Sequence, residues 1–442
     1  MLRSLRRAPI ALLVALAVPL TLPGVAPAFE IEPDQVVVKW APGSDARTAQ
    51  AAGDAPTVLK VRSVSGALRG LRRRSDVVYA VPNVRARAAQ DGYIPNDPGR
   101  AAGVAGGWQQ SQWNFVGPFS VNAPKAWANA IAARVPGGRG VRIAVLDTGV
   151  AYRTKPPYRI SPDFRARGHF VRGYDFVARD AYPTDRNGHG THVAGTIGEA
   201  TNNGIALTGL AYGARIMPVR VLDAAGEGNA SDIASGIRFA AKRGAQVINL
   251  SLEFDADVGA ADIPQVLDAI AYARRRGAIL VAASGNEGHG RVAYPARAKG
   301  VVSVGATTER GCVSEFSNYG SGLDLVAPGG GADAALAGDA GCRPDLAPGR
   351  NIFQVTLLGS SLGTFGIPLS YEGTSMATPH VSAAAALVIA TKVIGRRPTP
   401  TAIERHLKRT ARDLGPPGYD RRYGWGLLDA AAATAGPGAG VG

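Results

Sequence analysis

The stretch VRIAVLDTG, residues 141–149, decides the fold that this sequence predicts. Its first six residues are mostly apolar and follow a glycine, a pattern that is typical of a strand buried in a parallel sheet. Asp147 comes directly after the strand, at the edge where open α/β sheets place their ligands. The stretch therefore predicts a doubly wound, mostly parallel sheet flanked by helices. Taken alone, Asp147 could equally cap a turn or helix at Thr148-Gly149.

Two further segments place a histidine and a serine near the starts of expected helices. Residues 189–196 read HGTHVAGT, and residues 373–380 read GTSMATPH. The side chain of His189 can project into a cleft while the helix behind it packs on the sheet. The alanine-rich stretch after Ser375 favours a helix, and Pro379 requires it to begin close to Ser375, because a proline deep in a helix removes a hydrogen bond. The N–H groups and dipole at this helix end favour a developing oxyanion.

These residues also have uses without chemistry. Thr374 or Ser375 could serve only as a helix N-cap. His189 and His192, at positions i and i+3, could form a zinc pair, although no Glu follows His189 as in the metalloprotease helix motif and no cysteine lies nearby. A serine hydroxyl needs a base within hydrogen-bond reach, and that base needs an orienting carboxylate. The presence of all three types in separate, similarly placed segments favours nucleophilic catalysis.

A fourth segment adds a donor for that chemistry. Residues 279–283, ILVAA, predict another buried strand, and residues 284–288, SGNEG, follow it. The amide of Asn286, just beyond the strand end, can donate to the oxygen of a tetrahedral intermediate alongside the backbone N–H of Ser375. Loss of such a donor typically removes ~2.7–4 kcal/mol of transition-state stabilisation. A plain turn asparagine would look the same in isolation.

Together the four segments resemble the motifs of the subtilisin family of secreted serine endopeptidases, and the resemblance runs over about residues 113–432. It implies hydrolysis of peptide bonds in polypeptide substrates through an acyl-enzyme. It also implies four roles, namely orienting acid, base, nucleophile and oxyanion donor, for Asp147, His189, Ser375 and Asn286. His192 and His380, which share the motifs, have packing roles by the same resemblance.

Two rival interpretations make different demands on the sequence. A catalytically inactive relative that acts as a binding module predicts loss of one of the four residues, and none is lost. A nucleotide-dependent α/β enzyme predicts a phosphate loop such as GxxxxGK[ST] or GxGxxG between a strand and a helix, and neither stands in that context.

The N-terminal residues predict a signal peptide over residues 1–28. Three arginines precede an apolar run over residues 10–22, and small residues at 26–28 offer a cleavage site. The alternative is an N-terminal membrane anchor. We expect a secreted, extracellular or periplasmic protein with no stable membrane span once this segment is removed.

A small basic segment follows over residues 29–90. Strands are expected at residues 35–40 and 76–81, with a helix-like stretch around residues 68–73. This pattern resembles the family's inhibitory propeptide, which implies self-maturation and inhibition by the chain's own propeptide. The alternative is a small domain that stays attached. The catalytic domain is expected over residues 91–442, as a monomer.

Composition and charge narrow the partners and the compartment. The 442 residues carry a formal net charge of +15, with 57 Gly, 30 Pro and 46% hydrophobic residues, which suits one large, loop-rich α/β enzyme. The basic residues are scattered, and without a nucleic-acid fold signature we expect no nucleic-acid partner. The two cysteines, Cys312 and Cys342, fit one disulfide in an exported protein.

The family resemblance also implies where a substrate strand would bind. Its two flanking segments would be Gly226-Glu227-Gly228 and Ser251-Leu252-Glu253, with a pocket wall at residues 282–285 that includes Ala283 and Gly285. Many members have two glycines where this chain has Glu253-Phe254. Glu227 and Glu253 therefore favour a cation-preferring cleft, although they could also be solvated rim carboxylates.

The resemblance further implies a structural calcium ion. Its oxygen ligands would come from residues on either side of the His189 helix: Asp163, Thr201, Asn203, Ile205 and Leu207. Carboxylate, amide and carbonyl oxygens are the ligands that calcium prefers. The loop carries one residue more than the usual spacing counted from His189.

Overall fold

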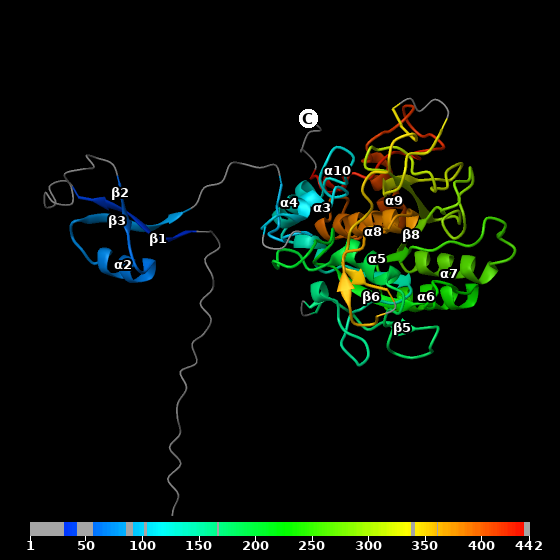
Figure 1. The fold of residues 1–442 in the computed structure, drawn as a ribbon, viewed down its shortest axis with the longest axis horizontal. Helices are drawn as coiled ribbons and strands as arrows, with labels where there is room; N and C mark the ends of the chain where they lie inside the picture. The colour runs from blue at the N-terminus through cyan, green and yellow to red at the C-terminus, as the bar shows by residue number, and fades with distance from the viewer. Residues whose placement is uncertain are drawn as a thin grey trace, which may run out of the picture. The chain divides into compact units, whose positions relative to one another are not determined.

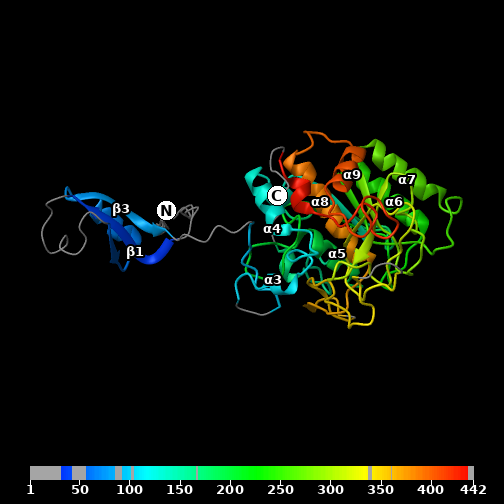
Figure 2. The same cartoon turned by 90° about the horizontal axis from the view of Figure 1, so that it is seen from above.

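A computed structural model of the chain describes residues 31–41, 56–84, 92–100, 104–165, 168–336, 341–359 and 361–436. The chain divides into two compact units, residues 1–90 and 91–442 (Figures 1 and 2). The expected signal peptide lies outside the described residues, and the functional division at residues 28 and 90 stays a prediction. Within the described residues, no helix is long and apolar enough to cross a membrane.

The smaller unit is an antiparallel sheet with one helix. Its strands are β1 (Ile31–Trp40), β2 (Thr57–Lys60) and β3 (Val77–Val84), in the order β2-β1-β3. Helix α2 (Val64–Leu71) begins at Ser63, whose hydroxyl accepts a hydrogen bond from the Gly66 N–H. Both predicted strands and the helix are present. The short strand β2, which pairs with the centre of β1, was not predicted because TVLK carries too little periodicity on its own.

The larger unit is built on a seven-stranded sheet in the order β10-β9-β8-β7-β4-β6-β5, in which every neighbouring pair is parallel. The strands are β4 (Arg142–Asp147), β5 (Tyr174–Asp175), β6 (Arg215–Arg220), β7 (Val247–Leu250), β8 (Ile279–Ala283), β9 (Val301–Thr307) and β10 (Leu325–Pro328). The expected fold class, a doubly wound parallel sheet, is confirmed.

Alternate side chains of each strand enter two separate cores. In β4, Ile143 and Val145 join a core with α5 (His189–Gly198) and α8 (Thr374–Thr391), whereas Ala144 and Leu146 join a core with α6 (Ala230–Lys242) and α7 (Pro264–Arg275). Because side chains alternate across a strand, this division shows that helices cover both faces of the sheet (Figure 1).

The remaining elements surround these layers. They are α3 (Trp108–Ser111), α4 (Ala123–Ala132), η1 (Pro136–Gly138), η2 (Pro162–Phe164), the pair β11 (Thr356–Leu357) and β12 (Phe365–Gly366), α9 (Pro400–Arg409) and α10 (Ala430–Thr434). The two tryptophans Trp108 and Trp127 pack edge to face at 5.4 Å and are fully buried in the core beside α8.

Cys312 and Cys342 form the expected disulfide, with their Cα atoms 5.7 Å apart. The bridge closes a loop between positions 30 residues apart in sequence. In the chain-entropy account, closing such a loop restricts the unfolded chain and stabilises the fold by ~3–4 kcal/mol.

We predict that replacing both cysteines, Cys312→Ala with Cys342→Ala, lowers the free energy of unfolding by ~3–4 kcal/mol, because the unfolded chain regains the freedom of the loop. Urea unfolding measures this difference. Reduced wild-type protein is the control and should match the double variant. A loss below about 1 kcal/mol in both would contradict the loop-closure account.

Candidate active site

Asp147 and His189 form a hydrogen-bonded pair between the end of β4 and the start of α5. Asp147 is fully buried, and its Oδ1 lies 2.7 Å from Nδ1 of His189, whose side chain is 25% exposed. The Thr148 N–H donates to the same carboxylate oxygen at 2.7 Å. Gly188, just before α5, has φ of 109°, a left-handed conformation that a residue with a Cβ rarely adopts. The turn at Gly188 therefore sets the entry of His189 into the helix.

A second buried carboxylate, Asp185, fixes that turn. It accepts hydrogen bonds from the N–H groups of Asn187, Gly188 and Thr191, and from the Thr148 hydroxyl at 2.9 Å. The strand end that carries Asp147 and the helix start that carries His189 thus share one anchor. Sequence reasoning missed Asp185. Its position four residues before His189 in a glycine- and asparagine-containing turn was the available signal.

The electrostatics of the pair raise the pKa of the imidazole. Burial lowers the pKa of His189, but the charge of Asp147, their hydrogen bond and the charge of Asp185 outweigh it, so the pKa lies above its ordinary value. With Nδ1 bonded to Asp147, the other ring nitrogen, Nε2, is directed at the cleft. This arrangement suits a base that accepts a proton at Nε2.

Ser375 is the second residue of α8, so its N–H has no intrahelical acceptor. Its hydroxyl donates to the carbonyl of Ser251 at 3.2 Å, and the Ser251 hydroxyl donates to the carbonyl of Ser375 at 2.9 Å. Pro379 stands four residues after Ser375 and lacks the N–H that would otherwise bond this carbonyl. The hydroxyl of Ser251, just after β7, fills that position and ties the start of α8 to the sheet.

Asn286 is exposed, and its amide orientation is fixed by Thr374. Its Oδ1 accepts from the N–H of Thr374 at 2.8 Å and from the Thr374 hydroxyl at 3.0 Å. The Nδ2 donor must then point away from Thr374, and it donates to Oε1 of Glu253 at 3.0 Å. The structure therefore brings Asn286 into contact with Thr374, the residue before Ser375, and with Glu253, a contact that sequence reasoning missed.

The two other motif histidines are structural. His192 is buried, bonds the Ile352 carbonyl through Nε2 at 3.0 Å and stacks on Tyr371 at 4.2 Å. Burial lowers the pKa of His192 to about 3 and that of His380 to about 4. His189 bonds Asp147 while His192 bonds a backbone carbonyl, so the two imidazoles have different partners.

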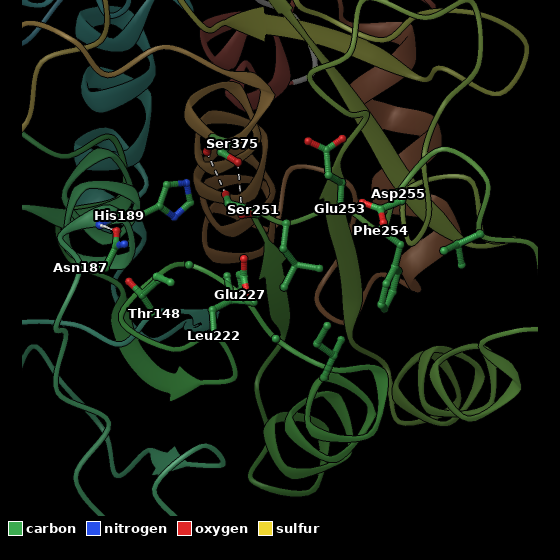
Figure 3. Close-up of a pocket in the computed structure, with 16 residues that line it drawn as sticks. Thr148, Asn187, His189, Leu222, Glu227, Ser251, Glu253, Phe254, Asp255 and Ser375 are labelled. Atoms are coloured by element: carbon green, nitrogen blue, oxygen red, sulfur yellow. Dashed lines mark hydrogen bonds between the residues drawn. The ribbon is translucent and has the colours of Figure 1, made fainter.

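A cleft of about 620 Å³ opens beside His189 and Ser375 (Figure 3). Its walls contain His189, Ser375 and both predicted substrate segments, with the side chains of Glu227, Glu253 and Asp255. Among its lining residues, all of which the structure describes, there is no Lys or Arg. Ala283 and Gly285, predicted as the pocket wall, do not line this cleft. A Cβ placed on Gly285 would lie 2.0 Å from Nδ2 of Asn318 and 2.5 Å from Oε2 of Glu253, so both side chains pack closely against this glycine.

A second group of carboxylates lies at the far end of α5. Asp163 is fully buried and accepts from the Asn203 side-chain amide at 2.7 Å and from the Leu207 N–H at 3.2 Å. Asp97, which sequence reasoning missed, accepts from the N–H groups of Asn203 and two neighbouring residues in the same loop. Burial, with the charge of Asp97, raises the pKa of Asp163 to about 7. Burial, with the charges of Asp163 and Asp97, also raises the pKa of the fully buried Glu199.

This group is rich in oxygen but is not arranged as a metal cage. Among the described residues, no cluster of three or more His, Cys, Asp or Glu side chains is placed to hold a metal ion. Asn203 directs Nδ2, rather than Oδ1, at Asp163, while its Oδ1 accepts from the Ile205 N–H at 2.8 Å. The Thr201 hydroxyl donates to the Glu199 carbonyl. Carboxylate oxygens are suitable ligands for a hard cation. For Asn203 to join them as a ligand, its amide would have to flip so that Oδ1 replaces Nδ2 beside Asp163.

Comparisons with known proteins agree with this geometry. Residues 138–426 match the family model described as Peptidase S8, subtilase family. The chain is 41% identical over 298 residues to Subtilisin Savinase of Lederbergia lenta, covering 67% of this chain and 91% of the relative. It is 35% identical over 331 residues to a thermophilic serine proteinase of a Bacillus species, covering 75% and 68%. A solved protease structure from Pseudoalteromonas arctica is similar with a TM-score of 0.61 and 33% identity, covering 77% of this chain and 98% of that chain.

We predict that Asp147→Asn lowers the pKa of His189, because the amide lacks the charge that raises it. A histidine whose pKa is raised by folding stabilises the fold below its unfolded pKa of about 6.5, and this contribution is lost as pH rises through the folded pKa. The substitution should therefore lower the free energy of unfolding most at about pH 5–6 and less toward alkaline pH.

NMR titration of the His189 ring and urea unfolding across pH measure both effects. Asp268→Asn, at an exposed position on α7, is the matched control and should leave the His189 titration unmoved. An unchanged His189 pKa in Asp147→Asn would show that the pair does not act electrostatically.

Proposed function

Because this chain belongs to the subtilase family of serine endopeptidases, which act on polypeptides, we propose that it cleaves peptide bonds with Asp147, His189, Ser375 and Asn286 as its catalytic residues. The observation that carries the proposal is the 2.7 Å contact between Asp147 and His189 at the cleft that Ser375 also lines. The alternative, an inactive binding module, is disfavoured because all four residues are present and lie together.

The reaction follows from the placement of these groups. The Ser375 hydroxyl attacks the scissile carbonyl carbon while Nε2 of His189 takes its proton, and Asp147 stabilises the resulting imidazolium. The negative oxygen of the tetrahedral intermediate accepts from the Ser375 N–H and from Nδ2 of Asn286. The imidazolium then protonates the leaving amine, which yields an acyl-enzyme. In the second half, water attacks the ester carbonyl while Nε2 of His189 takes its proton, and the imidazolium then gives that proton to the Ser375 oxygen as the acid product leaves.

Two hydrogen bonds of the free protein must change before this reaction. The Ser375 hydroxyl must leave the Ser251 carbonyl and turn toward His189. Nδ2 of Asn286 must leave Glu253 to reach the substrate oxygen. The free site is therefore a resting arrangement, and substrate binding completes the catalytic one.

The substrate is proposed to bind as an extended strand between the two cleft segments. Residues 226–228 and 251–253 line opposite parts of the cleft and offer backbone groups for strand addition. In such binding, main-chain hydrogen bonds supply affinity, and the pockets between them read alternate side chains. The side chains of Glu227 and Glu253 would then contribute to specificity.

Maturation and export are part of the same proposal. We propose that residues 1–28 direct secretion and that residues 29–90 form a propeptide that aids folding, inhibits the enzyme and is removed by its own activity. The separate core of the small unit, built from Val36, Val38, Leu68 and Ala80, supports an independently folding segment. The mature enzyme is proposed to be an extracellular or periplasmic monomer, which N-terminal sequencing and gel filtration of secreted protein would test.

Subtilases commonly bind calcium, and we propose one structural ion here. Asp97 and Asp163 would supply charge, Asn203 its amide oxygen, and residues 201, 205 and 207 their carbonyls. Such an ion would neutralise buried carboxylates that the free chain holds only with N–H donors.

We predict that Ser375→Ala lowers kcat on casein by about 10⁶-fold, the loss known for removal of the nucleophile in a subtilisin. The substitution removes one oxygen from a half-buried position, so the fold and melting temperature should be kept. The variant should also retain residues 29–90, because self-cleavage is lost. Ser361→Ala, at an exposed serine, is the control and should remain fully active. Normal casein cleavage by Ser375→Ala would refute the assignment.

We predict that excess chelator lowers the melting temperature by at least about 4 °C, because an ion at 100 times its Kd stabilises by ~2.7 kcal/mol. Asp163→Asn should remove most of this response, since it takes away one of the two ligand charges. Asp345→Asn, at an exposed carboxylate, should keep it. Calcium has no structural role here if the chelator leaves the wild-type melting temperature unchanged.

A further inference from the structure

The side chain of Glu253 contacts Asn286, the proposed oxyanion donor, through both of its carboxylate oxygens. Its Oε2 accepts from the Asn286 N–H at 3.0 Å, and its Oε1 accepts from Nδ2 of the same residue at 3.0 Å. The same carboxylate packs against Gly285, where a Cβ would lie 2.5 Å from Oε2 and 2.0 Å from Nδ2 of Asn318. Glu253 is half-buried, so it is not a freely solvated rim residue.

No Lys or Arg is among the described residues that line the cleft beside this carboxylate. Burial raises the pKa of Glu253, the hydrogen bonds from Asn286 lower it, and the charges of Glu287 and Asp255 raise it further. Glu227 adds another carboxylate to the cleft, whose described lining contains no Lys or Arg. The carboxylate is therefore held by two neutral N–H groups of Asn286, close to other carboxylates.

This position conflicts with catalysis on neutral substrates. The Nδ2 donor that should bind the negative oxygen of the intermediate is committed to Glu253. A carboxylate left beside that oxygen would also repel the charge that develops on it. Something must draw Glu253 away from Asn286 and neutralise it.

We propose that Glu253 caps the Asn286 donor in the free enzyme and releases it to a basic side chain, so that the enzyme selects Arg or Lys at the residue whose carbonyl is attacked. This inference rests on the proposed roles of Ser375 and Asn286 and names the substrate class of that site. The side chain of that residue enters beside Leu252 and Glu253, next to its own carbonyl. A guanidinium or ammonium there offers Glu253 a charged donor in place of the neutral amide.

The test uses peptides that differ only at this residue, with Arg against citrulline, its neutral isostere. Wild type should favour Arg in kcat/KM by at least about tenfold, the effect of one charge-assisted hydrogen bond. Much of that preference should lie in kcat, because release of Asn286 matters in the transition state. Glu253→Gly should cut cleavage after Arg and raise kcat after citrulline. Glu253→Gln should lose the preference but keep the cap, so kcat after citrulline stays low.

The controls separate this inference from the proposed function. Asp257→Asn removes a nearby exposed charge outside the cleft lining and should keep the preference for Arg. Equal cleavage after Arg and citrulline by wild type would overturn the proposal while casein cleavage still supports the endopeptidase. A Glu253→Gly enzyme that loses activity after Arg without gaining any after citrulline would overturn the capping role. Undiminished casein cleavage by Ser375→Ala would instead refute the function on which both rest.

Discussion

The parallel alignment of β4, β7 and β8 is the constraint on which the site depends. Leu146, Leu250 and Ala282 lie in register across these strands. Asp147, Ser251 and the turn that carries Asn286 therefore all lie at the carboxyl ends of these strands, on the same side of the sheet. Any shift of one strand by a residue would reverse its side chains between the two cores, so the packing of both faces fixes this edge. The proposed catalytic residues are spaced by apolar residues that take no part in the proposed chemistry.

The start of α8 is held to this edge by polar bonds rather than by packing alone. Pro379 leaves the Ser375 carbonyl without its helical donor, and the Ser251 hydroxyl supplies one. Thr374 donates to Asn286 through both its N–H and its hydroxyl. Ser375 is therefore held by the residue that follows β7, and Asn286, in the turn after β8, is held by the first residue of α8. The proline, which looks like a defect within a helix, is what makes the Ser251 contact available.

The sequence predicted those features that one segment determines alone. The buried strand before Asp147, the helix that begins near Ser375 and the turn with Asn286 each follow from local patterns of apolar and turn residues. Contacts between distant segments could not be predicted in this way. The bond between Glu253 and Asn286 depends on how one side chain turns across neighbouring strands, and Asp97 meets its loop from 105 residues away. The packing of the Glu253 and Asn318 side chains against Gly285, part of the predicted pocket wall, likewise could not be predicted from local patterns.

The two ends of α5 show how the position of His189, the proposed base, depends on residues far from the cleft. At its start, Asp185 holds the turn and Thr191. At its end, Asp97 and Asp163 hold the loop that follows the helix, largely through backbone N–H groups. Buried carboxylates satisfied in this way resist displacement, because a lost bond would leave a charge without a partner. The helix that carries His189 is thus clamped at both ends, and the segment around Asp97, near the start of the larger unit, contributes to the geometry of the base.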